Sequence, residues 1–233
     1  MSLTNPVASS YDRVATQYTA RIADELAAKP LDRALLRAFA EQVGTLGPIG
    51  DLGCGPGHVT AFLASAGVAV EGIDLSHPMI AQAHHRYPTL AFHQGDMRSL
   101  AVDDATFGGI SAFYSIIHLA PSELVPTFQE WWRALRRTGS VLVAFHSGDS
   151  VVHLDSWWDQ PVELDFRFLQ AEAVASALEE AHFSIEATLR RAPYADVEHP
   201  SERAYLLARK HSWNGHIRLC TRDARDSIHI GSA

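Results

Sequence analysis

The 233-residue sequence is poor in cysteine and in positive charge. It holds two cysteines, and because a disulfide at Cys54 would obstruct a glycine-rich turn, we expect a reduced, cytoplasmic compartment. The formal net charge of −8 argues against a nucleic-acid partner, since phosphates need clustered Lys and Arg side chains. No apolar run approaches the roughly 18 residues that cross a bilayer, and no signal peptide or membrane partner is expected.

Metal-ligand patterns are also missing. The thirteen histidines form no His-x-x-x-His pair, so no metal is expected. The densest basic run, Arg133, Arg136 and Arg137, is predicted to lie on one short helix as a solvated face. Hydrophobic residues make up 47% of the chain, which is enough for one domain with a sizeable core and a small cap.

The stretch from Asp51 to Gly57 organises the chain. It follows the start of a buried strand and precedes a helix predicted over 60–66. Gly53, Gly55 and Gly57 give a turn without side-chain bulk, so a ligand can lie on the backbone. The free N–H groups of the helix favour an anionic ligand group, whereas the Asp51 carboxylate suits an ammonium or a sulfonium.

A nicotinamide dinucleotide fits this turn poorly. A carboxylate at Asp51 repels a pyrophosphate, and His58 stands where the dinucleotide fingerprint has Gly or Ala. A nicotinamide-dependent oxidoreductase is therefore the least favoured interpretation.

Strands and helices alternate along the core, which predicts a parallel sheet. After the first strand, which ends at Asp51, strands are expected at 68–74, 90–93, 107–114 and 140–146, and helices at 31–42, 124–135 and 170–181. The segments 183–189 and 204–209 are expected to pair as a hairpin. The second strand ends at Asp74, where an acid takes the ribose hydroxyls of an adenosyl ligand.

The motif Asp51-Leu52-Gly53-Cys54-Gly55-Pro56-Gly57, with Asp74 and the later Gly95-Asp96-Met97, resembles the class I S-adenosylmethionine-dependent methyltransferases. The resemblance covers residues 11–210. It implies an α/β, Rossmann-like, seven-stranded and mostly parallel sheet with helices on both faces and a closing antiparallel β-hairpin. It also implies an N-terminal helical lid at 11–45 and a cap or substrate insertion at 147–168. Residues 1–10 are expected to fray, and 211–233 to form an appended tail.

The resemblance implies S-adenosyl-L-methionine as cofactor. Asp96 would accept from the adenine amino group, and Met97 would pack on the ring. The segment from Tyr11 to Tyr18 either lids the cofactor, with Arg21 near its carboxylate, or packs on the core through its aromatics. The cofactor-binding candidates are Tyr11, Tyr18, Arg21, Asp51, Gly53, Cys54, Gly55, Gly57, Asp74, Leu75, Met79, Asp96, Met97 and Tyr114.

Methyl transfer needs orientation and, for an oxygen or protonated nitrogen acceptor, a base. His118 is the first candidate because the pKa range of histidine suits the task, although a role in shaping the pocket is equally open. His146 and Tyr18 are the other catalytic candidates. Trp157 and Trp158 either contact the acceptor, together with His118 and His146, or fill the core of the cap.

The predicted function is therefore methyl transfer from S-adenosylmethionine to an O or N atom of a small molecule. The alternative is a non-catalytic S-adenosylmethionine-binding partner that regulates another protein. The sequence leaves open whether the acceptor is a phenol, a sugar amine or a carboxylate, and whether the protein is a monomer or a homodimer.

Overall fold

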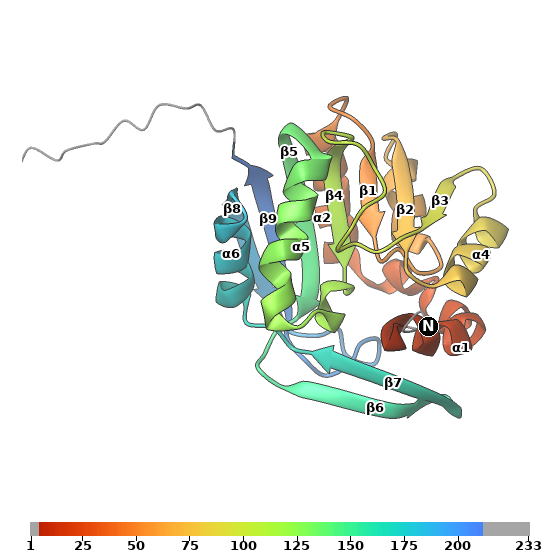
Figure 1. Ribbon diagram of the computed structural model, residues 1–233. Helices are drawn as coiled ribbons and strands as arrows, with labels where there is room; N and C mark the ends of the chain where they lie inside the picture. Colours follow the sequence, from red (N-terminus) through yellow and green to blue (C-terminus); the bar gives the residue numbers. More distant parts are fainter. Residues whose placement is uncertain (1–4, 212–233) are drawn as a thin grey trace, which may run out of the picture.

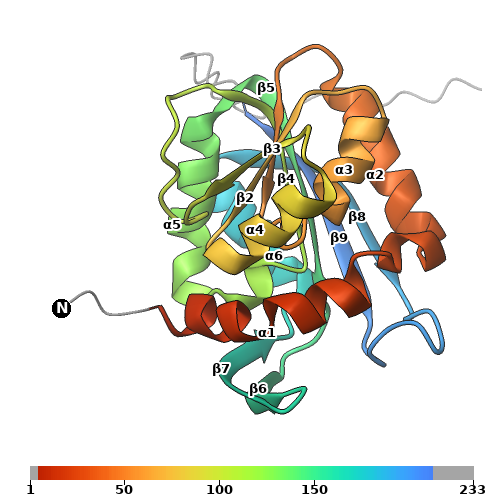
Figure 2. The ribbon, with the colours of Figure 1, turned by 90° about the vertical axis from the view of Figure 1, so that its right-hand side faces the viewer.

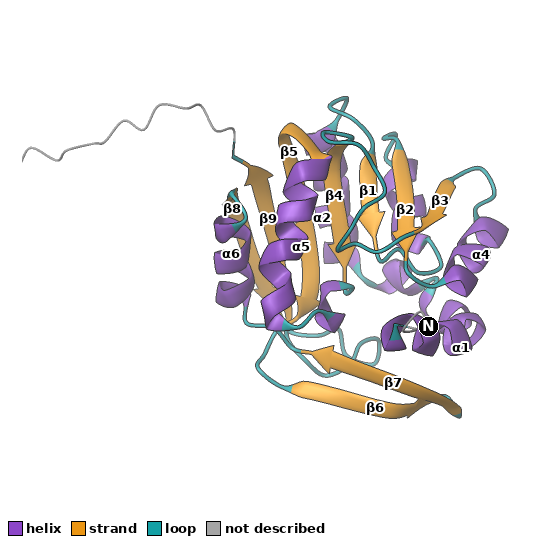
Figure 3. Ribbon diagram, in the orientation of Figure 1, coloured by secondary structure: helices purple, strands orange, loops and turns teal. Residues whose placement is uncertain are grey.

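The computed structural model describes residues 5–211 and contains a seven-stranded sheet flanked by helices (Figure 1; Figure 3). The strand order is β3-β2-β1-β4-β5-β9-β8. The first five of these are parallel: β1 (Ile49–Leu52), β2 (Val70–Asp74), β3 (Ala91–Gln94), β4 (Phe107–Phe113) and β5 (Leu135–His146). The antiparallel pair β8 (Phe183–Arg191) and β9 (Arg203–Lys210) closes the sheet, which confirms the predicted fold class.

Helices cover both faces of this sheet (Figure 2). Helices α5 (Pro121–Ala134) and α6 (Ala171–Glu180) lie on one face, and α2 (Pro30–Val43) and α3 (His58–Ser65) lie on the other. Helix α4 (His77–Arg86) follows β2, and α1 (Pro6–Ile22) runs past the carboxyl ends of the parallel strands. Within residues 5–211, every helix is too short or too polar to span a bilayer.

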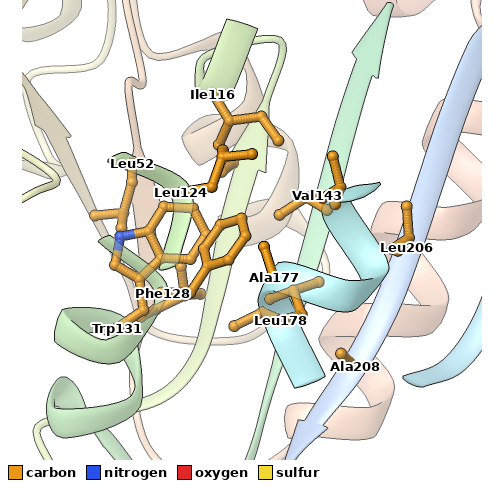
Figure 4. Close-up of a cluster of buried hydrophobic side chains, with 14 of the residues drawn as sticks. Leu52, Ile116, Leu124, Phe128, Trp131, Val143, Ala177, Leu178, Leu206 and Ala208 are labelled. Atoms are coloured by element: carbon orange, nitrogen blue, oxygen red, sulfur yellow. The ribbon is translucent and has the colours of Figure 1, made fainter. Parts of the chain in front are cut away.

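The larger hydrophobic cluster fills the space between the sheet and α5 and α6 (Figure 4). Phe128 and Trp131 of α5 and Leu178 of α6 face Val143 and Leu206 of the sheet, and all five are buried. Because the central strands are covered on both faces, their sequences are nearly continuous apolar runs. This explains why they could be located from the sequence.

Two local expectations are corrected. Residues 5–10 are not frayed, because α1 begins at Pro6 and Asn5 caps it by accepting the Val7 N–H at 3.0 Å. Arg136 and Arg137 do not share a helix with Arg133, since α5 ends at Ala134 and Leu135 turns to an extended conformation to pair with Phe107 in β4.

The segment predicted as a cap insertion at 147–168 folds as a separate two-stranded sheet. Its strands are β6 (Val151–Trp157) and β7 (Gln160–Arg167), which pair antiparallel. This hairpin lies beyond the carboxyl ends of the parallel strands, beside α1 (Figure 1). Apart from His211, the tail predicted at 211–233 lies outside the described residues.

Candidate functional site

A cavity of about 780 Å³ is lined by residues at the carboxyl ends of β1, β2 and β4, by α1 and by the β6–β7 hairpin. Ligands bind in this place in open α/β sheets. The predicted site residues that line this first cavity are Tyr11, Tyr18, Gly53, Gly55, Asp74, Leu75, Met79, Asp96, Met97, Tyr114 and His118.

The glycine turn and Asp74 are joined by hydrogen bonds. The Gly55 N–H donates to Asp74 Oδ2 and the Ser76 N–H donates to Oδ1, both at 2.8 Å. Burial raises the pKa of Asp74 to about 6, although these two hydrogen bonds oppose the rise. Each carboxylate oxygen keeps a lone pair for a ligand donor such as a hydroxyl group.

Gly53 is required by its surroundings. Its φ of +72° favours glycine, and a Cβ added there would lie 2.3 Å from the Cβ of Ser115. Ser115 is itself held by its hydroxyl, which donates to the Leu52 carbonyl at 2.8 Å. The backbone of β1 therefore meets the end of β4 directly beside the cavity.

Asp51 does not line the cavity, in contrast to the expectation that its carboxylate faces a ligand. It is buried beneath the turn, where Thr60 Oγ1 donates to it at 2.6 Å and Ser111 Oγ at 2.7 Å. Burial raises its pKa. Asp51 thus anchors α3 and β4 to β1 and shapes the turn from below.

Three further cofactor candidates do not line the first cavity. Cys54 is buried in a small cluster with Phe92, and Gly57 lies against the Phe92 ring. The Arg21 guanidinium stacks over the ring of Trp158, 4.4 Å from its centroid. Trp158 does not line the first cavity; it packs in the apolar cluster between α1 and the hairpin.

Asp96 lines the first cavity but is already engaged by a cation. Arg98 donates to both of its oxygens and also pairs with Glu123 of α5 at 2.8 Å. The hydrogen bonds and charge of Arg98 outweigh burial and lower the pKa of Asp96, which keeps it an acceptor. The neighbouring Met97 is fixed through its carbonyl, which accepts from the Trp131 indole at 2.9 Å.

Tyr11 and His118 form the polar pair that the sequence did not predict. His118 Nδ1 lies 2.9 Å from the Asp165 carbonyl oxygen, which can only accept, so Nδ1 carries the proton. Nε2 therefore accepts from the Tyr11 hydroxyl at 2.8 Å. Burial lowers the pKa of His118 to about 4, so the ring is neutral at pH 7.

A second cavity of about 370 Å³ adjoins the first. Tyr11, Tyr18 and Tyr114 line both cavities, so the two spaces meet at these rings. The Tyr114 hydroxyl lies 3.3 Å from Asp32 Oδ1 and 3.2 Å from the Tyr205 hydroxyl, which holds its ring between the cavities.

The second cavity contains two more of the predicted residues, His146 and Trp157. His146 Nδ1 bonds Ser201 Oγ at 2.9 Å, and its ring stacks on Phe168. Burial lowers its pKa to about 3. Trp157 packs edge-on against both Tyr11 and Tyr18.

Several lining residues were missed in the sequence. In the second cavity they include Phe166, Phe168 and four charged side chains, and in the first they include His153, Asp165 and Arg167. The signal that could have located the residues of the hairpin is the strict apolar–polar alternation over 162–168, which is typical of a strand.

Comparison with known proteins identifies relatives for part of the chain. Residues 49–139 match a family model described as a methyltransferase domain. The chain is 32% identical over 130 residues to a malonyl-[acyl-carrier protein] O-methyltransferase of Erwinia billingiae. The aligned region covers 54% of this chain and 51% of that protein. It is 31% identical over 140 residues to a demethylmenaquinone methyltransferase of Beutenbergia cavernae. That alignment covers 59% of this chain and 57% of the relative. The match thus spans about half the length of each relative.

The fold also resembles solved structures. A glycopeptide N-methyltransferase complexed with S-adenosyl-L-methionine superposes with a TM-score of 0.60, covering 76% of this chain and 92% of that one. The sequence identity is 18%, so this likeness concerns the fold alone.

Proposed function

We propose that this chain, which belongs to the class I S-adenosylmethionine-dependent methyltransferase family, transfers a methyl group from S-adenosyl-L-methionine to an O or N atom of a small molecule. The observation that carries the proposal is the first cavity, which brings the glycine turn, Asp74 and Asp96 together at the carboxyl ends of the parallel strands. We further propose that the protein acts in the cytoplasm as a monomer or homodimer and has no nucleic-acid partner, which its net charge of −8 supports.

The residues of the first cavity suit the parts of this cofactor. The ionised Asp74 accepts from the ribose hydroxyls, since its oxygens bond only one backbone N–H each. Asp96 accepts from the adenine amino group beside the apolar Met97. The backbone at Gly53 and Gly55 lines the cavity without side chains and would hold the methionine part of the ligand.

When bound, the cofactor supplies a methyl group that is already activated on a sulfonium. The protein then has to orient the acceptor, exclude water and take a proton where the acceptor carries one. Tyr11 is placed for this because it lines both cavities and its hydroxyl bonds His118.

We infer that the pair Tyr11 and His118 takes the acceptor proton. The acceptor O–H or N–H would donate to the Tyr11 oxygen, and the Tyr11 hydroxyl proton would pass to His118 Nε2. His118 becomes an imidazolium, Tyr11 ends as the neutral phenol that it was, and the acceptor has lost one proton, so the transfer balances. The Asp165 carbonyl holds the ring in position throughout.

Calorimetric titration with S-adenosylmethionine, S-adenosylhomocysteine and NADH tests the cofactor. Micromolar binding of an adenosyl ligand without binding of NADH supports the proposal, and the reverse result contradicts it. Transfer of a radiolabelled methyl group to a panel of phenols, amines and carboxylic acids then tests turnover. Binding with no transfer to any acceptor, including proteins of the source cell, would favour the non-catalytic alternative.

A further inference from the structure

The β6–β7 hairpin presents two chemically different faces to the two cavities. Val152 and Leu154 of β6 line the second cavity, whereas His153 between them lines the first. On β7, Phe166 lines the second cavity and Asp165 lines the first. The pairing register places Val152 opposite Phe166 and His153 opposite Asp165, so each face is consistent across both strands. The second cavity therefore receives the apolar face.

The rim of the second cavity is apolar as well. Within residues 5–211, three large hydrophobic side chains are markedly exposed, namely Val151, Val152 and Val197. Val152 and Val197, which are 38% and 45% exposed, line the second cavity. Exposed hydrophobic side chains gathered at the mouth of a pocket indicate that its ligand is apolar.

The charged groups of the second cavity cancel one another. Lys29 pairs with Glu25 at 2.7 Å and lies 3.4 Å from Glu198, and Arg203 lies 3.7 Å from Glu198. Glu198 is further held by Arg191 at 2.6 Å. An anionic or cationic ligand would have to compete with these pairs and lose its own hydration, so the cavity favours a neutral ligand.

We propose that the second cavity is the methyl-acceptor site and that it takes a neutral aromatic hydroxy compound. The rings of Trp157, Phe166 and Phe168 form walls on which a flat ligand packs. The shared Tyr11 places the proton-accepting pair where the ligand hydroxyl meets the first cavity. This inference rests on the proposed methyl transfer and narrows its acceptor to a phenol-type oxygen.

Three naphthalene probes of matched ring size test the proposal by calorimetry at pH 7.5, with and without saturating S-adenosylhomocysteine. They are neutral 2-naphthol, anionic 2-naphthoate and cationic trimethyl-2-naphthylammonium. We expect 2-naphthol to bind at least about tenfold more tightly than either ion.

Two adjacent valines provide a matched pair of variants. Val152→Arg places a charged side chain at the mouth of the second cavity and should weaken 2-naphthol binding about tenfold. Val151 lines neither cavity, so Val151→Arg should change the affinity for 2-naphthol less than about twofold. Both side chains are exposed, so both variants should fold and keep the wild-type affinity for S-adenosylhomocysteine.

Tighter binding of either ion, binding of no probe, or equal effects of the two variants would overturn the acceptor proposal. Failure of the wild-type protein to bind S-adenosylhomocysteine would instead contradict the proposed function. The two failures are therefore separate, because S-adenosylhomocysteine binding reports on the first cavity, whereas the difference between the two valine variants in naphthol binding reports on the second.

Discussion

Asp74 is the residue on which cofactor binding should depend most directly. Its folded-state pKa is raised to about 6 by burial, so it is ionised at pH 7.5 and largely protonated at pH 5.5. Ribose hydroxyls bind the ionised form, so the affinity for S-adenosylhomocysteine should fall as the pH drops, by about fourfold between these values.

The matched control is Asp74→Asn. It has no carboxylate to titrate, so its affinity should be lower at pH 7.5 and should not change down to pH 5.5. Calorimetry at three pH values measures both proteins. A wild-type affinity that stays constant over this range would show that Asp74 does not hold the ligand in its ionised form.

Comparing Gly53 with Gly67 separates two costs of an added side chain: a steric clash and an unfavourable backbone conformation. Both have positive φ, at +72° and +88°, but an added Cβ meets Ser115 at Gly53 and nothing within 4 Å at Gly67. We expect Gly67→Ala to cost about 1–2 kcal/mol of unfolding free energy, as the left-handed conformation alone predicts. Gly53→Ala should cost more and should also weaken S-adenosylhomocysteine binding. Urea unfolding and calorimetry test this, and equal costs would contradict it.

Residue types at the site were predictable, but side-chain directions were not. The motif identified Asp51 and Asp74 at neighbouring strand ends. Only the fold shows that Asp51 turns beneath the glycine loop toward Thr60 and Ser111. Arg21 likewise stacks on Trp158, a partner contributed by the hairpin. Contacts between segments distant in sequence leave no local pattern, which is why these two expectations differed from the structure.

Among the elements, the parallel strands and the closing hairpin were predictable because buried strands give apolar runs bounded by Gly and Pro. The segment 147–168 was predicted only as a cap insertion, and its strands β6 and β7 were not predicted. Val162, Leu164, Phe166 and Phe168 alternate with polar residues, and this pattern alone indicates a strand with two different faces.

Helix α1 is attached to this hairpin through Ser10. The Glu163 N–H donates to Ser10 Oγ at 2.8 Å, and the Ser10 hydroxyl lies 3.3 Å from the Glu163 carbonyl. Ser10 is buried, so Ser10→Ala leaves the Glu163 N–H without its partner and should cost about 1–3 kcal/mol. Amide hydrogen exchange should become faster in α1 and in β7.

Ser9 is the matched control for Ser10. Its hydroxyl bonds only carbonyls of its own helix, those of Asn5 and Pro6. Ser9→Ala should therefore change the unfolding free energy by less than about 0.5 kcal/mol and leave exchange in β7 unaltered. Equal effects of the two substitutions would show that α1 and the hairpin are not held together at this point.

For the whole molecule, Asp32 joins elements from both ends of the described chain. It is fully buried at the start of α2, where Oδ2 accepts from Arg191 of β8 at 2.8 Å and Oδ1 accepts from Tyr205 of β9 at 3.1 Å. Its contact with Tyr114 extends this network to the boundary between the two cavities. The closing hairpin, α2 and the candidate site therefore depend on one carboxylate.

Asp32→Ala should lower the unfolding free energy by about 3–5 kcal/mol, because it leaves the Arg191 cation without one of its buried partners. Asp24→Ala is the control: Asp24 also pairs with an arginine, Arg86, but its side chain is 91% exposed, and we expect a loss below about 1 kcal/mol. Urea unfolding followed by circular dichroism and by tryptophan fluorescence measures both. Because the network joins α2 to the closing strands, the two signals should shift together for Asp32→Ala, and a shift in only one of them would contradict unfolding of the described domain as one unit.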